Sequence, residues 1–144
     1  MKKLIYLFDI EPVILAGLSS WLLRRPDIKI AAKATSVDEA LHIIASANID
    51  ADTQIIAITE LSFRKIGEAK NEDGFKIIKA INDSGKPIKP LVFSSLDSGG
   101  YLRTCMSQSY KVCGFVSKAC GINTIIEAID RIFSGEQYFS ENLK

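Results

Sequence analysis

A short, almost unbroken apolar run at residues 53–60 constrains the fold of this chain more than any other stretch. The run is rich in β-branched residues and ends abruptly in the polar pair Thr59 and Glu60. A strand that helices cover on both faces has this composition, because neither face tolerates polar side chains. In an open parallel α/β sheet, ligands and chemistry are found at the carboxyl ends of the strands. We therefore expect Thr59 and Glu60 to lie at a functional edge.

Apolar periodicity predicts five strand–helix units along the chain. The predicted strands cover residues 4–8, 28–34, 53–60, 91–94 and 112–117, and helices follow each of them, the fourth at 100–109. Such alternation requires crossover helices, and therefore a parallel sheet with right-handed connections. We predict a single doubly wound α/β domain at residues 1–135, with a five-stranded parallel sheet and helices on both faces. Residues 136–144 are expected to form a tail or the start of a linker to an output domain.

The composition argues against several classes of function. A formal net charge of +1 gives no electrostatic basis for binding nucleic acid or a membrane surface. No apolar run approaches the roughly 20 residues that span a bilayer. The three cysteines are odd in number and lack the close pairs of a zinc site, so we expect reduced thiols in a cytoplasmic protein.

Residues at the predicted strand ends resemble the receiver domains of two-component response regulators. They are Asp9 after the first strand, Ser94 at the end of the fourth, and the run Gly-Phe-Val-Ser-Lys at residues 114–118. Their order and spacing are most similar to the NarL/LuxR type, in which a helix-turn-helix output domain follows the receiver. The resemblance extends over essentially the whole chain. It implies a flavodoxin-like sheet with strand order 2-1-3-4-5.

The resemblance also implies a site for phosphoryl transfer to a carboxylate. In the family, an aspartate at the end of the third strand attacks, first-strand carboxylates hold a divalent metal, and a lysine adds positive charge. Here it implies that Lys118 is this lysine, Ser94 the hydroxyl switch and Phe115 the aromatic switch. Thr59 takes the position of the acceptor aspartate, and Glu60 takes it if the alignment shifts by one residue.

The acceptor position departs from the family pattern. A threonine hydroxyl is a far weaker nucleophile than a carboxylate, and the sequence offers no adjacent base to activate Thr59. Side chains alternate along a strand, so a shift that makes Glu60 the acceptor would place it on the opposite face. We therefore expect Thr59 to be a degenerate acceptor position, with Glu60 as the alternative.

The metal-binding position departs as well. Ile10 replaces the second acid of the first strand, which leaves Asp9 and Glu11 as a remnant of the acidic pocket. Two carboxylates support magnesium poorly, so we expect magnesium binding to be weak or absent. We expect Asp9 to form an ion pair with Lys118 in place of the metal cluster.

The favoured interpretation is an atypical receiver, not an enzyme, that regulates transcription or a partner through protein contacts without aspartyl phosphorylation. The expected partners are a histidine kinase, an output domain, a partner regulator or a second copy of the chain, with no DNA binding by these residues alone. A phosphorylatable receiver that uses Glu60 and a stand-alone interaction module are the alternatives. A flavin enzyme is excluded, because the carboxylates of Asp9 and Glu11 and the missing amide of Pro12 disfavour a phosphate in the first loop. We expect no cofactor.

Overall fold

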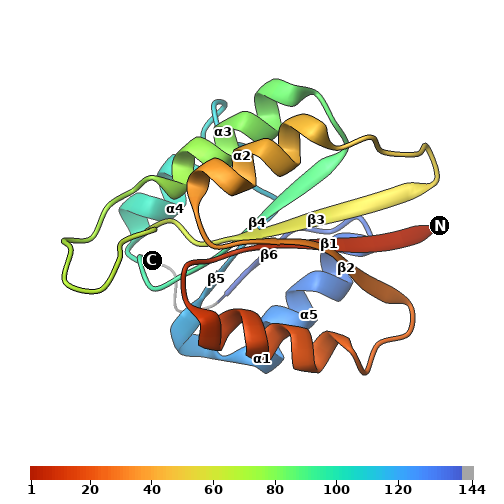
Figure 1. The fold of residues 1–144 in the computed structure, drawn as a ribbon, viewed down its shortest axis with the longest axis horizontal. Coiled ribbons are helices and arrows are strands. Elements are labelled where there is room, and N and C mark those ends of the chain that lie inside the picture. The colour runs from red at the N-terminus through yellow and green to blue at the C-terminus, as the bar shows by residue number, and fades with distance from the viewer. Residues whose placement is uncertain (141–144) are drawn as a thin grey trace.

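The computed structural model describes residues 1–140, in which strands and helices alternate around one sheet (Figure 1). The strands are β1 (Lys2–Phe8), β2 (Ile28–Ala34), β3 (Thr53–Thr59), β4 (Ile88–Ser94), β5 (Gly114–Ser117) and β6 (Tyr138–Phe139). The helices are α1 (Pro12–Leu22), α2 (Val37–Ser46), α3 (Gly74–Ser84), α4 (Gly99–Cys105), the 3₁₀ turn η1 (Lys118–Cys120) and α5 (Ile122–Phe133). The strand order is β2-β1-β3-β4-β5-β6, and every pairing is parallel. The doubly wound α/β prediction is confirmed.

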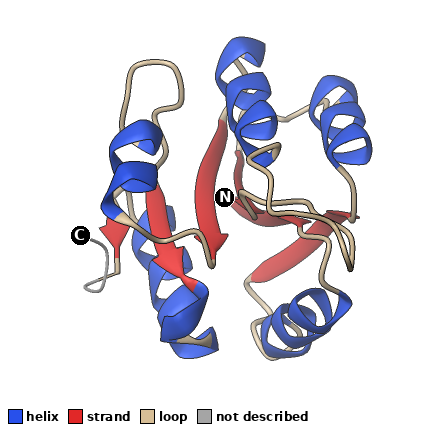
Figure 2. Cartoon of the chain, turned by 90° about the vertical axis from the view of Figure 1, so that its left-hand side faces the viewer, coloured by secondary structure: helices blue, strands red, loops and turns tan. Residues whose placement is uncertain are grey.

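Two layers of helices cover the sheet. α1 and α5 lie on one face, and α2, α3 and α4 lie on the other (Figures 1 and 2). β3 supplies side chains to both layers: Ile56 and Ile58 pack toward α1 and α5, whereas Ile55 and Ala57 pack toward α2 and α3. All four are at most 3% exposed. The central apolar run is therefore a strand that is buried on both faces, as the sequence predicts.

Local sequence signals fix the helix ends. Pro12 occupies the first turn of α1, where its missing N–H group is not needed. The Ser36 side chain accepts a hydrogen bond from the Glu39 amide at 3.1 Å, which caps α2 as the capping-box pattern predicts. Gly85 ends α3 with a φ of 66°, a left-handed conformation that suits glycine. Within residues 1–140, no helix has the length and apolar character needed to cross a membrane.

The sheet has six strands rather than the predicted five. Part of the predicted tail forms β6, whose Tyr138 amide donates to the Cys113 carbonyl at 3.2 Å and whose neighbour Ser140 donates from its amide to Phe115 at 3.0 Å. Two residues carry no periodicity, so the sequence did not predict this strand. Gly114 permits the close pairing, because a Cβ atom there would lie 2.7 Å from the Tyr138 carbonyl oxygen. Residues 141–144 of the predicted tail lie outside the described residues.

α4 is shorter than predicted, ending at Cys105 instead of residue 109. The chain turns here because long-range contacts hold the following segment against α3. The Tyr110 ring packs on Phe75 with ring centroids 5.0 Å apart, and the Asn82 side chain donates to the Ser109 carbonyl at 3.2 Å. Neither contact is visible in local sequence, which explains the error at this boundary.

Gly74 is predicted to be indispensable, because the start of α3 lies directly against the end of β3. A Cβ atom at this position would lie 2.1 Å from the Glu60 carbonyl oxygen and 2.6 Å from the Leu61 Cα atom. In urea melts, Gly74→Ala should therefore lower the free energy of unfolding by about 1–3 kcal/mol, which is the usual cost of overpacking. Gly17→Ala in α1 is the control. Its Cβ would meet only the Ile122 side chain, at 3.8 Å, so it should be neutral or stabilising. Equal melting midpoints for the two variants would contradict this account.

Candidate functional site

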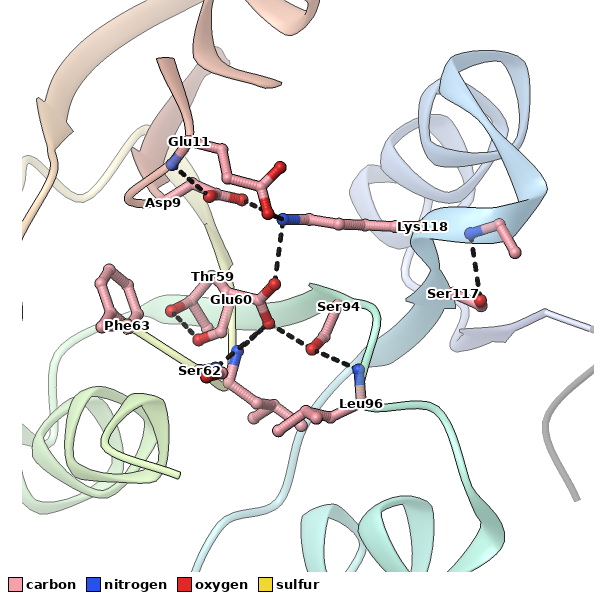
Figure 3. Close-up of polar contacts among 12 residues, drawn as sticks. Asp9, Glu11, Thr59, Glu60, Ser62, Phe63, Ser94, Leu96, Ser117 and Lys118 are labelled. Carbon is pink, nitrogen blue, oxygen red and sulfur yellow. Dashed lines mark hydrogen bonds and ion pairs between the residues drawn. The ribbon is translucent and has the colours of Figure 1, made fainter. Parts of the chain in front are cut away.

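Four side chains from different strand ends meet at the carboxyl edge of the sheet. Asp9 directly follows β1, Glu60 follows β3, Ser94 ends β4 and Lys118 follows β5. The carboxyl ends of parallel strands lie at one edge of the sheet, so residues far apart in sequence come together there. Figure 2 views the molecule from this side, and Figure 3 shows Lys118 reaching between Asp9 and Glu60.

Lys118 is the centre of a buried ion-pair cluster. Its Nζ lies 2.9 Å from Asp9 Oδ2, 2.9 Å from Glu60 Oε1 and 3.3 Å from Glu11 Oε1. The side chains of Lys118, Asp9 and Glu60 are 10%, 6% and 3% exposed, whereas Glu11 is 54% exposed at the rim. The predicted ion pair between Asp9 and Lys118 is present. The sequence did not predict that Glu60 shares the same ammonium.

The second carboxylate oxygen of Glu60 is held by three donors. Oε2 accepts hydrogen bonds from the Leu61 amide at 2.5 Å, from the Ser62 amide at 3.2 Å and from the Ser94 hydroxyl. Ser94 Oγ in turn accepts from the Leu96 amide at 3.0 Å, which orients the hydroxyl. Both oxygens of the Glu60 carboxylate are thus bound, one by charge and one by neutral donors (Figure 3).

Thr59 does not share this environment. It is the last residue of β3, pairs with Phe8 and Val92 in the sheet, and donates from its hydroxyl to the Glu60 carbonyl at 3.0 Å. The geometry places Glu60 opposite Ser94 and Lys118, the positions that the resemblance assigns to the switch and the lysine. The Glu60 carboxylate, and not the Thr59 hydroxyl, therefore binds Ser94 and Lys118.

Phe115 points into the core. It is fully buried in β5 and belongs to a cluster that includes Leu61, Val92 and Cys105 of α4. An aromatic ring in this position supports the wall between β5 and α4. The ring therefore points inward in this structure.

One contact network at the edge was not predicted. The Ser117 hydroxyl donates to Asp97 Oδ2 at 2.6 Å, and the Ser117 amide donates to the Ser140 hydroxyl at 3.1 Å. These bonds join the β4–α4 loop, β5 and the end of β6. The only sequence signal was the position of Ser117 beside Lys118, because Asp97 and Ser140 are distant in sequence.

Burial and the neighbouring charges together shift the pKa values of Asp9 and Lys118. Burial raises the pKa of Asp9 to about 6 from its ordinary value of 3.8, and the nearby Lys118 charge only partly offsets this effect. Burial also disfavours the charge on Lys118, but the attraction of Glu60 and Asp9 outweighs it and raises the pKa of Lys118. The ammonium is therefore kept charged, whereas Asp9 is ionised less readily than an exposed carboxylate.

The residues at this edge do not fit a divalent metal well. Magnesium requires several oxygen ligands in near-octahedral geometry. The two buried carboxylates, on Asp9 and Glu60, both contact Lys118, and Ile10 offers no oxygen. Among residues 1–140, no group of three or more His, Cys, Asp or Glu side chains is arranged to hold a metal ion. The Lys118 ammonium supplies the positive charge between the carboxylates.

Lys118→Met is predicted to cost about 3–5 kcal/mol of unfolding free energy, because it leaves the carboxylates of Asp9 and Glu60 buried without a cation. Urea melts of the single and double variants measure this. Lys118→Met combined with Asp9→Asn should lose less than the sum of the two single changes, since the two residues interact directly. Lys76→Met is the control. It removes an exposed pair at 3.6 Å and should cost under about 1 kcal/mol. Strictly additive losses at Lys118 and Asp9 would show that they do not interact.

The free energy of unfolding is predicted to fall as pH rises from about 4 to 7, because the buried Asp9 carboxyl loses its proton in this range. Its carboxyl has an ordinary pKa of 3.8 and a folded pKa of about 6, so the folded state holds the proton more tightly in this range. The stabilisation that comes from protonated Asp9 is present below pH 4 and is lost as pH rises through 6. The loss amounts to about 3 kcal/mol at most. A pH series of urea melts should show a flatter dependence for Asp9→Asn than for the unchanged chain. Asp83→Asn, at an exposed ion pair with Lys79, is the control variant. A slope that Asp9→Asn does not alter would contradict this prediction.

Comparisons with known proteins agree with this geometry at the level of the fold. No family model and no curated protein sequence matches the chain. The isolated receiver domain of RcsB from Salmonella enterica serovar Typhimurium, solved with phosphomimetic BeF3-, matches with a TM-score of 0.79 at 15% identity, covering 99% of this chain and 96% of that one. A LuxR-family response regulator from Aurantimonas sp. matches with a TM-score of 0.78 at 20% identity, covering 99% and 93%.

A longer Salmonella RcsB structure, bound to promoter DNA with BeF3-, also matches. Its TM-score is 0.79 at 15% identity, and the match covers 99% of this chain but 65% of that one. The chain therefore spans about two thirds of that DNA-bound regulator. At these identities the likeness establishes the architecture and not the activity. The chain has the fold of response-regulator receiver domains.

Proposed function

We propose that this chain is an atypical response-regulator receiver that controls a partner protein in the cytoplasm through surface contacts, without aspartyl phosphorylation. It acts as a regulatory module of two-component signalling and not as an enzyme. The observation that carries the proposal is the Glu60 carboxylate, which the Ser94 hydroxyl and the Lys118 ammonium bind at the same time. In the family these two groups bind the transferred phosphoryl group.

The state of the Glu60 oxygens argues against phosphoryl transfer. A carboxylate attacks phosphorus with a free lone pair, but Oε1 is paired with Lys118 and Oε2 accepts three hydrogen bonds. Such bonds stabilise the negative charge and lower its nucleophilicity. Glu60 is also one methylene longer than aspartate, so its carboxylate reaches the place that a phosphoryl group takes in the family. It would therefore hold Ser94 and Phe115 in the signalling arrangement without any modification.

Magnesium has no role in this proposal. In the family the metal screens the phosphoryl oxygens, and here the Lys118 ammonium supplies positive charge beside Asp9 and Glu60. We propose that Mg²⁺ binding is weak or absent and that the site needs no cofactor. This rests on the donor set, in which Ile10 replaces a carboxylate.

The output is proposed to lie in protein contacts. Candidate partners are a histidine kinase, a partner regulator, a second copy of the chain, or a DNA-binding output domain like that of the longer RcsB structures. The net charge of +1 gives no overall attraction to DNA, so any transcriptional effect would require such an output domain or partner.

Treatment with acetyl phosphate and Mg²⁺, followed by intact-mass measurement, tests the proposal. The unchanged chain should gain no phosphoryl mass. Glu60→Asp combined with Ile10→Asp should gain one phosphoryl group that is lost in hydroxylamine, because it shortens the carboxylate and restores the missing acid. Thr59→Asp combined with Ile10→Asp should stay unlabelled, because Thr59 contacts neither Ser94 nor Lys118.

Two outcomes would change the assignment. Labelling of the unchanged chain with acyl-phosphate lability would overturn the proposal in favour of a phosphorylatable receiver that uses Glu60. Failure of the folded Glu60→Asp and Ile10→Asp variant to label would favour a stand-alone interaction module that retains only the fold.

A further inference from the structure

The loop between β3 and α3 has a defined conformation. At its base, the Asn71 amide donates to Ser62 Oγ at 3.1 Å and the Phe63 amide donates to Asn71 Oδ1 at 2.9 Å. At its tip, Arg64 Nη1 donates to the Glu68 carbonyl at 3.0 Å, and the Glu68 amide donates to the Lys65 carbonyl at 3.0 Å. A loop whose base and tip are both held by hydrogen bonds loses little conformational entropy when it binds a partner. In Figure 1 it projects from the carboxyl edge.

The tip of this loop exposes a large apolar side chain. Ile66 is fully exposed, and Val13 in the first turn of α1 is 80% exposed. Both line one cleft of about 590 Å³, together with Ile10 and Pro12. Single exposed apolar residues are common, but several that line a common cleft are typical of an interaction site. We call this cleft the loop–helix cleft; its apolar lining residues are Ile10, Pro12, Val13 and Ile66.

Cations flank the loop–helix cleft. Arg64 and Lys65 line it, and neither has a carboxylate within 4.0 Å of its charged nitrogen among the described residues. The one acid in the wall, Glu11, is already paired with Lys118 at 3.3 Å. Available positive charge therefore borders an apolar floor. An occupant that carries apolar side chains between carboxylates would complement both features.

The cleft also adjoins the buried site. A neighbouring hollow of about 250 Å³ reaches Glu60 and shares five lining residues with the loop–helix cleft: Ile10, Glu11, Arg64, Lys65 and Ile66. Glu60 in turn binds the amides of Leu61 and Ser62, where the loop begins. Contacts in the cleft and the arrangement around Glu60 are thus joined through a few covalently linked residues.

We propose that the loop–helix cleft is a docking site for an acidic, apolar peptide segment of a partner protein. Apolar side chains of the segment cover Val13 and Ile66, and its carboxylates pair with Arg64 and Lys65. The inference rests on the proposed function only in taking the partner to be a protein. It locates the contact at the β3–α3 loop and the start of α1, and it requires neither phosphorylation nor its absence.

A random dodecapeptide phage library, selected on the immobilised chain, tests this proposal. The enriched peptides should combine Asp or Glu with Leu, Ile, Phe or Trp, and synthetic copies should bind the unchanged chain in fluorescence polarisation. Ile66→Asp and Lys65→Glu should each weaken this binding at least tenfold, because one removes the apolar contact and the other reverses the cation. Leu23→Asp is the matched control. It changes a residue that is 85% exposed just beyond the other end of α1 and should leave binding unchanged.

Several results would overturn the proposal. They are the absence of enrichment, enrichment of basic peptides, and binding that Ile66→Asp leaves intact. Self-association that Ile66→Asp abolishes, measured by sedimentation, would reassign the cleft to a second copy of the chain. Binding to vesicles with anionic lipid in place of peptides would reassign it to a membrane. None of these measurements involves phosphoryl transfer. A result that overturns the docking site can therefore be distinguished from a result that overturns the proposed function.

Discussion

The carboxyl edge of this sheet depends on one buried ammonium. Lys118, which follows β5, contacts carboxylates that follow β1 and β3, and all three side chains are at most 10% exposed. An isolated charge in such a place costs several kcal/mol, so each charge is tolerated only because the others are present. Two buried carboxylates share one cation; burial is the main cause of the raised pKa of Asp9, and the nearby Glu60 charge adds to it. The cluster thereby links the segments that follow β1, β3 and β5 through side-chain contacts.

The sequence predicted most of the fold because its signals are local. The apolar run of β3, the proline that begins α1 and the capping box of α2 each act within a few residues, and all three are as predicted. Two of the differences from the prediction have another cause. β6 and the end of α4 are set by contacts with distant segments, such as the packing of Tyr110 on Phe75 and the pairing of Tyr138 with Gly114. Periodicity within a segment carries no information about such contacts.

The candidate site was predictable as far as topology determines it. Asp9 and Lys118 were paired from sequence because parallel strands end at one edge, and the structure contains that pair. The choice between Thr59 and Glu60 was not predictable from alternation. Alternation places the side chains of Thr59 and Glu60 on different sides, but it does not say which of the two faces Ser94 and Lys118. That depends on where β4 and β5, which are distant in sequence, end beside β3. The bond between Ser117 and Asp97 was missed because it joins two loops that are distant in sequence.

The length of one side chain gives the proposed function its physical basis. A glutamate places its carboxylate about 1.5 Å farther from the backbone than an aspartate does. Ser94 ends β4 and Lys118 follows β5, so a group that contacts both must extend beyond the end of β3. An aspartate at this position would leave room that a phosphoryl group fills on modification. We propose that Glu60 fills that room itself, and that the bonds to its carboxylate oxygens make them poor nucleophiles. On this proposal, glutamate in place of aspartate at position 60 prevents phosphorylation. It also produces the arrangement of Ser94 and Lys118 that phosphorylation would otherwise produce.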